Sequence, residues 1–331
     1  MKSLKYMGFA LVAASCMQFA AAQQPVKLSA YVQLPGGKPA LLELERGDGE
    51  GSFFYMQKGT DQLMQSKAAT CKMFYIQTPA DMANAQRDYY GGDYADARKQ
   101  FASIKKKYAA FAGLPGSPCT MAALYELTCA VRMLDVAAVK ELAAALPGAS
   151  SLTGADAARV DAAKVVGLID DKPESFAAIK TAVEDVLKKH NRNLDSESNG
   201  WLRYALARGA AAQVPAGAAI AEDKVKAASA AVDFYCQAVM AMHGSQKVLP
   251  MDALNRSIAL LWAMPGVQDY AAKVSTPVDK SGWNAAPADF RDAVAMAHYL
   301  KTIYPSETPN ELADKLDAYY FNTLKGVKKG E

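Results

Sequence analysis

The sequence predicts a mainly α protein, with stacked antiparallel helical hairpins behind a small N-terminal antiparallel β subdomain. Apolar residues recur at helical spacing from residue 79 to the end of the chain. Proline and glycine breakers interrupt this pattern at regular intervals, as they do between the helices of a hairpin array. Before residue 79, glycine clusters separate short aromatic runs, a pattern typical of β-hairpins.

Residues 1–22 are predicted to be a secretory signal peptide. Lys2 and Lys5 form a basic start, residues 6–22 are uncharged and largely apolar, and the segment ends in three alanines. A signal peptidase needs small side chains at such a position, so we expect cleavage before Gln23. The mature protein is then periplasmic or secreted.

A lipid anchor through Cys16 is the alternative. Residues 13–16, Ala-Ala-Ser-Cys, partly match the sequence at which bacterial lipoproteins are cleaved and acylated. No later segment offers about 18 consecutive uncharged apolar residues. We therefore expect no membrane span after signal removal.

Residues 23–78 are predicted to form the β subdomain. Apolar or aromatic runs at 26–34, 41–44, 53–56 and 71–76 are separated by turn-forming residues. This pattern predicts about three or four antiparallel strands. So few strands are marginally stable alone, and we expect them to pack on the helices that follow.

Residues 79–331 are predicted to form the helical-hairpin domain, with about eleven helices of about 10–20 residues each. The clearest apolar stripe, with steps mostly of three and four, falls within residues 221–243. It contains Ala221, Val225, Ala228, Val232, Cys236, Val239 and Met240. Such a stripe marks the buried face of an amphipathic helix.

Residues 89–101 predict one hairpin in detail. Gly92 allows a tight turn between two helices, and Tyr94 packs beneath that turn. Ala97 is small where the helices approach closely, and Phe101 fills the space one helical turn further on. This stretch resembles the turn and second helix of a tetratricopeptide repeat.

The next two predicted hairpins follow this pattern loosely. Leu134-Asp135 stands where Gly92-Asp93 stood, about 42 residues later, and residues 169–171 form a third joint. The spacing exceeds the about 34 residues of a regular tetratricopeptide repeat. We therefore expect a degenerate array rather than a regular superhelix.

Composition argues against nucleic acid as a partner. The whole chain carries a net charge of +3, and loss of Lys2 and Lys5 leaves about +1. Binding to phosphates needs a clustered basic surface. The main basic clusters, at 105–107 and 325–329, are interpreted as solvated helix ends.

Four cysteines remain after signal removal: Cys71, Cys119, Cys129 and Cys236. An even number in an oxidising compartment is compatible with two disulfides, and four free buried thiols are the alternative. Cys119 and Cys129 should not bond, because ten residues of one helix separate them by about 15 Å. If a bond exists, Cys71 to Cys119 is the favoured pair.

Catalytic and metal-binding patterns are absent from the sequence. None of the three histidines has a second histidine four residues later, and no Cys-x-x-Cys or Gly-x-Ser-x-Gly motif occurs. The best carboxylate cluster, Asp170, Asp171 and Glu174, is interpreted as a helix cap. No metal, cofactor or catalytic residue is therefore predicted.

The favoured function is an exported non-catalytic scaffold that binds a protein or peptide in the cell envelope. The alternative is an envelope glycan- or peptide-processing enzyme whose carboxylates come from distant helices. The resemblance implies that Gln86, Tyr89 and Tyr90, on the first helix of the recognisable hairpin, face the partner-binding groove. Tyr89 and Tyr90 lie about 100° apart on a helix, so at least one hydroxyl should reach solvent.

Overall fold

The computed structural model of the chain describes residues 26–60, 62–215, 219–305 and 310–320. The predicted signal peptide and Cys16 lie outside these residues. The described chain is mainly helical, with a five-stranded antiparallel sheet at its N-terminal end. Within it, no helix combines the length and the apolar character that crossing a bilayer requires.

The sheet has the strand order β4-β3-β2-β1-β5. Four strands form a meander, and the fifth returns to pair with the first. The strands are β1 (Leu28–Gln33), β2 (Ala40–Gly47), β3 (Ser52–Met56), β4 (Leu63–Lys67) and β5 (Met73–Ile76). The sequence predicted about three or four strands. The strand that it missed, β4, is exposed along most of its length and shows no buried face.

One face of the sheet is apolar and buried. Ala30, Val32 and Leu44 are almost completely inaccessible, as is Phe53 on β3. These strand residues form one buried core together with residues of α1, α2 and α3. The sheet therefore packs on the helices that follow, as its small size requires.

The described part of the chain contains thirteen α-helices. They are α1 (Ala80–Gly91), α2 (Tyr94–Lys107), α3 (Pro118–Arg132), α4 (Val136–Ala144), α5 (Gly154–Val166), α6 (Ser175–His190), α7 (Ser196–Ala211), α8 (Val225–Met242), α9 (Val248–Trp262), α10 (Val267–Ala271), α11 (Lys280–Ala285), α12 (Ala288–Ile303) and α13 (Glu311–Asp317). The sequence predicted about eleven, because α10 and α11 are too short to show a periodic pattern.

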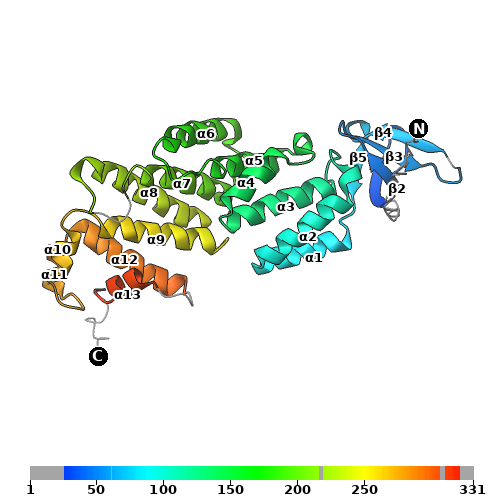
Figure 1. Cartoon of the computed structure of the whole chain (residues 1–331). Helices are drawn as coiled ribbons and strands as arrows, with labels where there is room; N and C mark the ends of the chain where they lie inside the picture. The colour runs from blue at the N-terminus through cyan, green and yellow to red at the C-terminus, as the bar shows by residue number, and fades with distance from the viewer. Residues whose placement is uncertain (1–25, 61, 216–218, 306–309, 321–331) are drawn as a thin grey trace, which may run out of the picture.

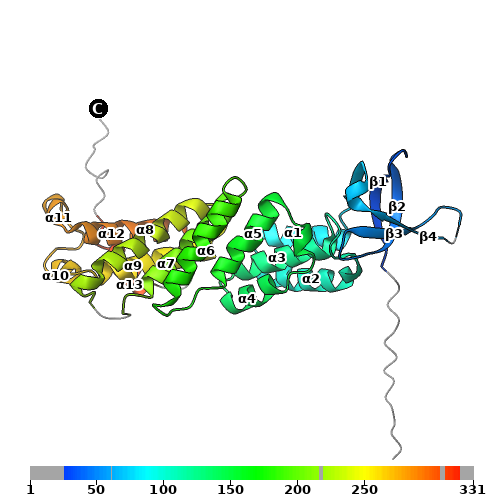
Figure 2. The ribbon, with the colours of Figure 1, turned by 90° about the horizontal axis from the view of Figure 1, so that it is seen from above.

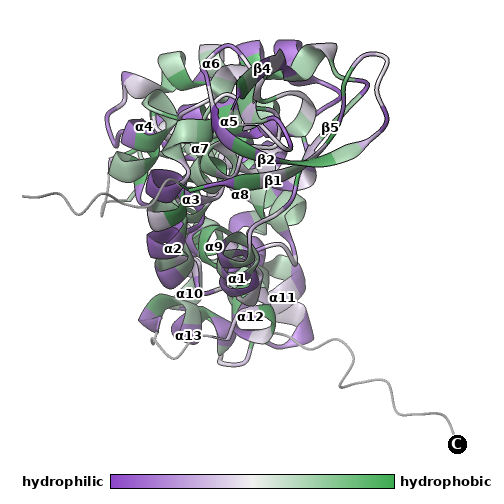
Figure 3. Cartoon of the chain, turned by 90° about the vertical axis from the view of Figure 1, so that its right-hand side faces the viewer, coloured by the Kyte–Doolittle hydropathy of each residue, from purple (hydrophilic) through white to green (hydrophobic). Residues whose placement is uncertain are grey.

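The helices form an elongated array with the sheet at one end and α10–α13 at the other (Figure 1). The view from above shows the same succession (Figure 2). From α1 to α9, helices that follow one another in the chain pack together, and α1, α3, α5 and α7 also contact one another in turn. Seen from the sheet end, polar and apolar segments alternate on the helices, as expected for amphipathic helices (Figure 3).

The joint between α1 and α2 has the geometry that the sequence predicted. Gly92 has a φ of 90°, in the left-handed region, and Asp93 caps α2 by accepting a hydrogen bond from the Asp96 N–H. Ala97 and Phe101 are fully buried, and the Tyr94 ring packs against Tyr89. Glycine suits this turn because it adopts a positive φ without strain.

The joint between α3 and α4 repeats this geometry without glycine. Leu134 has a φ of 57°, and Asp135 caps α4 by accepting a hydrogen bond from the Ala138 N–H. The correspondence of Leu134-Asp135 with Gly92-Asp93 is therefore confirmed in the backbone. The Arg98 side chain of α2 also forms a 2.7 Å ion pair with Asp135, which ties the two hairpins together.

Two apolar cores run through the molecule. One joins the sheet to α1–α3, and the other extends from α3 to α13. Residues of α3 belong to both, since Cys119 and Ala122 face the first core while Leu124 and Leu127 face the second. This helix therefore connects the two ends of the array.

The predicted stripe of α8 needs one correction. Met240 is exposed, and Ala221 precedes the helix. The buried face instead passes through Ala228, Val232, Tyr235, Val239 and Met242. These positions follow steps of three and four without interruption, whereas Met240 lies about 100° off that face.

Candidate functional site

The three residues predicted to contact a partner lie on α1, but their surroundings differ. Tyr90 is 72% exposed, Gln86 is half-buried, and Tyr89 is only 2% exposed. The expectation that at least one of the two tyrosines reaches solvent is confirmed. Tyr89 itself cannot meet a partner, so its prediction as a binding residue is wrong.

Tyr89 is buried because it is the centre of an aromatic cluster. Its ring lies edge-on to Tyr94, Phe101 and Tyr125, with centroids 5.0 to 6.3 Å apart. The Arg132 guanidinium lies 4.3 Å from the centre of the same ring. Such edge-to-face and cation–π contacts fix the position of α1 on α2 and α3.

A buried ion pair lies against this aromatic cluster. Arg132 of α3 donates two hydrogen bonds to Glu197 of α7, from Nε to Oε1 at 2.7 Å and from Nη2 to Oε2 at 2.8 Å. Both side chains are 9% exposed. Arg132 also donates a 3.2 Å hydrogen bond to the Tyr94 hydroxyl. The pair therefore links the first hairpin to a helix in the middle of the array.

Tyr90 and Gln86 lie one turn apart on α1 and meet the same residue of α3. The Tyr90 and Tyr125 hydroxyls are 3.2 Å apart. Burial and the Tyr90 hydrogen bond raise the pKa of Tyr125 to about 12, while a hydrogen bond with Gln86 opposes this rise. We call the surface formed by Gln86, Tyr90, Met121 and Tyr125 the α1–α3 face.

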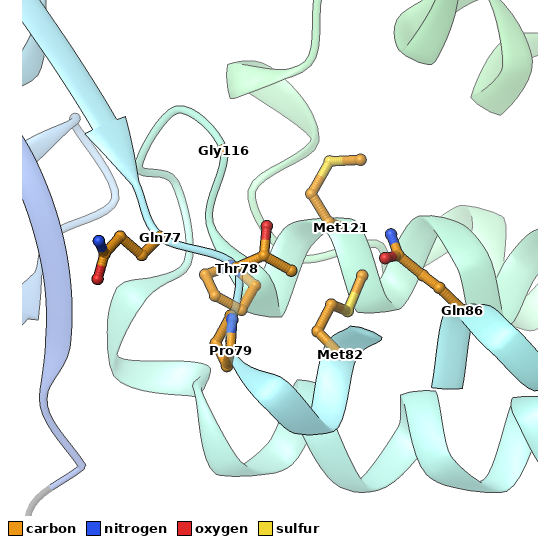
Figure 4. A pocket seen from close by; sticks show the side chains of 8 residues that line it. Gln77, Thr78, Pro79, Met82, Gln86, Gly116 and Met121 are labelled. Carbon is orange, nitrogen blue, oxygen red and sulfur yellow. The ribbon is translucent and has the colours of Figure 1, made fainter. Parts of the chain in front are cut away.

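A small hollow of about 150 Å³ lies at one end of this face, and we call it the Gln86 hollow. The side chains of Met82 and Gln86 rise from α1 beside Met121 of α3 (Figure 4). Thr78 and Pro79 close it on the side of the sheet. Its walls are largely apolar and hold no carboxyl group.

A larger hollow of about 530 Å³ lies at the Tyr90 end, and we call it the Tyr90 hollow. One wall is the joint between α1 and α2, from Tyr90 to Tyr94. A second wall is the loop from His243 to Val248, between α8 and α9, and the third is Ile303 with Tyr304 at the end of α12. The hollow thus brings together three segments that are far apart in the chain.

All four described cysteines are free thiols in the structure. Cys119 and Cys129 lie on the same helix, α3, as the sequence predicted. Cys71 is half-buried beside the core that contains Cys119. Burial raises the pKa of each thiol, to about 12 for Cys129, which disfavours the reactive thiolate.

The carboxylate cluster before α6 does not act as a helix cap. Glu174 occupies the cap position but accepts no hydrogen bond from the helix. Asp171 instead pairs with Arg208 of α7 at 2.6 Å, and Asp170 pairs with Lys172 at 2.7 Å. The interpretation of these residues as caps is wrong, because Asp170 and Asp171 lie before the cap position and each pairs with a cation.

Carboxylates suited to acid–base catalysis do not gather in either hollow. Among the described carboxyl groups with a shifted pKa, Asp292 on α12 is the one shifted upward, through burial and the nearby Asp289. Asp292 lines neither hollow. Neither of these two hollows therefore brings carboxylates together as the enzyme alternative requires.

The histidines serve as partners of other side chains. His190 Nε2 lies 2.9 Å from Asp161, which also binds Lys164 and Lys189. His243 Nδ1 lies 3.1 Å from the Tyr299 hydroxyl. In the residues that the structure describes, no three His, Cys, Asp or Glu side chains gather as a metal site would require.

Sequence reasoning missed three members of these surfaces: Tyr125, Gln246 and Tyr304. Tyr125 could have been found, since it occupies the half-exposed position on α3 opposite Tyr90. Gln246 and Tyr304 carry no local pattern that marks them. They line the same hollow as Tyr90 only because the α8–α9 loop and the end of α12 lie beside the α1–α2 joint.

Comparisons of the chain with protein-family models, with curated proteins and with solved structures found no match.

Proposed function

We propose that this chain is an exported, non-catalytic scaffold that binds a protein or peptide of the cell envelope through the α1–α3 face. The observation that carries the proposal is the exposed ring of Tyr90, held against Tyr125 between two hollows. An exposed tyrosine supplies a large apolar area together with a hydroxyl, a combination favoured in interfaces.

The architecture supports the same assignment. The resemblance to a tetratricopeptide repeat makes α1 the first helix of its pair, and such helices line the groove of those proteins. The contacts of α1 with α3 and of α3 with α5 are consistent with a continuous layer of first helices. Extended layers of this kind suit elongated partners such as peptides.

The cellular location is part of the proposal and rests on the sequence of residues 1–22. Intact-mass measurement of the exported protein tests it. A mature chain that begins at Gln23 supports a soluble protein outside the cytoplasm. Acylation of Cys16 would instead show that the protein is a lipid-anchored lipoprotein.

Site-specific crosslinking tests the binding function. A photoreactive amino acid replaces Tyr90 in the full chain, and crosslinked partners are recovered from the cell envelope and identified by mass spectrometry. Tyr75 on β5 is the matched control, since it is also an exposed tyrosine but lies on the sheet. We expect one protein to be captured at position 90 and not at position 75.

The affinity of Tyr90→Ala for that partner should fall by about 1–3 kcal/mol, or about 5- to 150-fold. Its melting temperature should stay near that of the unmodified protein, because the ring is exposed. Equal capture at both positions, or no capture at position 90, contradicts the proposed face.

A further inference from the structure

The Tyr90 hollow has features of a built ligand site, beyond its volume. Gln246 and Tyr304 line it and are only 5% and 6% exposed. Gln246 Oε1 and the Tyr304 hydroxyl each have no hydrogen-bond partner in the described part of the chain. Buried polar atoms are nearly always paired, and here two of the unpaired ones among the described residues belong to side chains that line one hollow.

The rim of the hollow carries exposed apolar side chains. Tyr90, Val248 and Ile303 are all exposed large apolar side chains that line it. Each comes from a different wall. A ligand with one apolar side chain would contact all three and remove them from water.

The charge of the hollow has a single sign. Its lining contains the cationic Lys247 and no acidic residue. Lys247 is exposed and forms no ion pair with any described residue. Asp93, which lies between the lining residues Gly92 and Tyr94 in the chain, caps α2. Arg132, which reaches Tyr94 from below, is neutralised by Glu197.

We propose that the Tyr90 hollow binds an acidic peptide segment that places one apolar side chain beside its acid. The carboxylate pairs with Lys247, and the apolar side chain lies among Tyr90, Val248 and Ile303. A peptide N–H donates to Gln246 Oε1, and the Tyr304 hydroxyl donates to a peptide carbonyl. This inference rests on the proposed function and names the chemistry of its partner.

Selection from a random heptapeptide library displayed on phage tests this chemistry on the full mature protein. We expect enrichment of peptides with Asp or Glu next to an aromatic or aliphatic residue. Lys247→Glu should weaken the selected peptides at least about tenfold, which is about 1.4 kcal/mol. It should also shift a fresh selection toward Lys and Arg. Lys226→Glu on α8 is the matched control, since Lys226 is an equally exposed lysine far from the hollow.

Tyr304→Phe provides a second, independent variant. It removes a hydroxyl that has no partner within the described residues, so the melting temperature should not fall. Its affinity for the selected peptides should fall about 2- to 10-fold. If Lys247→Glu fails to fold, Tyr304→Phe and Lys247→Ala still test the site.

Three results overturn the proposal. These are no enrichment from the library, enrichment of neutral or basic peptides, and selection of the same acidic peptides by Lys247→Glu as by the unmodified protein. Dodecanoate, which also joins a carboxylate to an apolar chain, is measured by calorimetry in parallel. Binding of dodecanoate that depends on Lys247, without selection of acidic peptides, identifies a lipid site instead. A partner captured at Tyr90 alongside any of these results leaves the proposed function standing.

Discussion

Removing one partner of the buried Arg132–Glu197 pair should destabilise the protein strongly. The two charged groups share two hydrogen bonds of 2.7 and 2.8 Å and are almost excluded from water. Hydrogen bonds to charged groups contribute about 1.5–3 kcal/mol each, so two give about 3–6 kcal/mol. Glu197→Leu and Arg132→Met should therefore each lower the free energy of unfolding by about 3–5 kcal/mol.

The double variant should behave differently from the sum of the two. Replacing both charges with apolar side chains removes the cost of burying either one alone. Because Arg132 also contacts Tyr89 and Tyr94, some loss should remain, and we expect about 1–2 kcal/mol. Urea unfolding followed by circular dichroism measures all four members of the cycle.

The more exposed Arg98–Asp135 pair provides the comparison. It has a similar length of 2.7 Å, but its side chains are 27% and 39% exposed. Arg98→Met should cost only about 0.2–1 kcal/mol, since water screens the pair. Losses below about 1 kcal/mol for Glu197→Leu, or a double variant that equals the sum of its parts, would refute this account of the buried pair.

Three further predictions concern stability and are measured by urea or thermal unfolding. Tyr89→Ala should lower the free energy of unfolding by about 3–5 kcal/mol, since it removes the centre of the aromatic cluster. A loss under about 1 kcal/mol would mean that this ring is not buried. Gly148→Ala should cost at least about 2 kcal/mol more than Gly116→Ala, because both have a positive φ but only at position 148 does a new Cβ lie 2.3 Å from a neighbouring side chain. Equal losses would mean that the loop relaxes. Asp161→Asn should cost about 1–3 kcal/mol at pH 7. Burial alone would raise the pKa of Asp161, but hydrogen bonds from two lysines and a histidine outweigh burial and leave the pKa below its ordinary value. This stabilisation is therefore present above about pH 4 and is lost as the pH falls below it. A stability difference that stays constant from pH 7 to pH 3 would contradict the assignment.

Much of the fold could be predicted because it is encoded locally. The α1–α2 joint follows from Gly92 and Asp93, which stop one helix and cap the next. The α3–α4 joint was found by its place in the array, although Leu134 gives no hint of a positive φ. Strand β4 was missed because it is an exposed edge, and an edge strand needs no alternation of apolar and polar residues.

The candidate site could be predicted only in part. The sequence shows that Tyr89 and Tyr90 face different directions, but it does not show which of them is buried. That choice depends on where Tyr125 and Arg132 lie, and both come from the next hairpin. The Tyr90 hollow was beyond prediction, since its walls become neighbours only after the helices from α2 to α12 have packed.

This long-range closure makes the Tyr90 hollow sensitive to distant changes. One wall belongs to the first helical pair and another to the α8–α9 loop. The helices between these two segments set the distance between the walls. A small rotation at an intermediate helix–helix contact displaces one wall relative to the other. Substitutions in α5 or α6, which touch neither wall, can therefore widen or narrow the entrance. Natural selection for ligand binding would then act on the packed helices throughout the array. Residues that contact only other helices would also set the dimensions of the hollow.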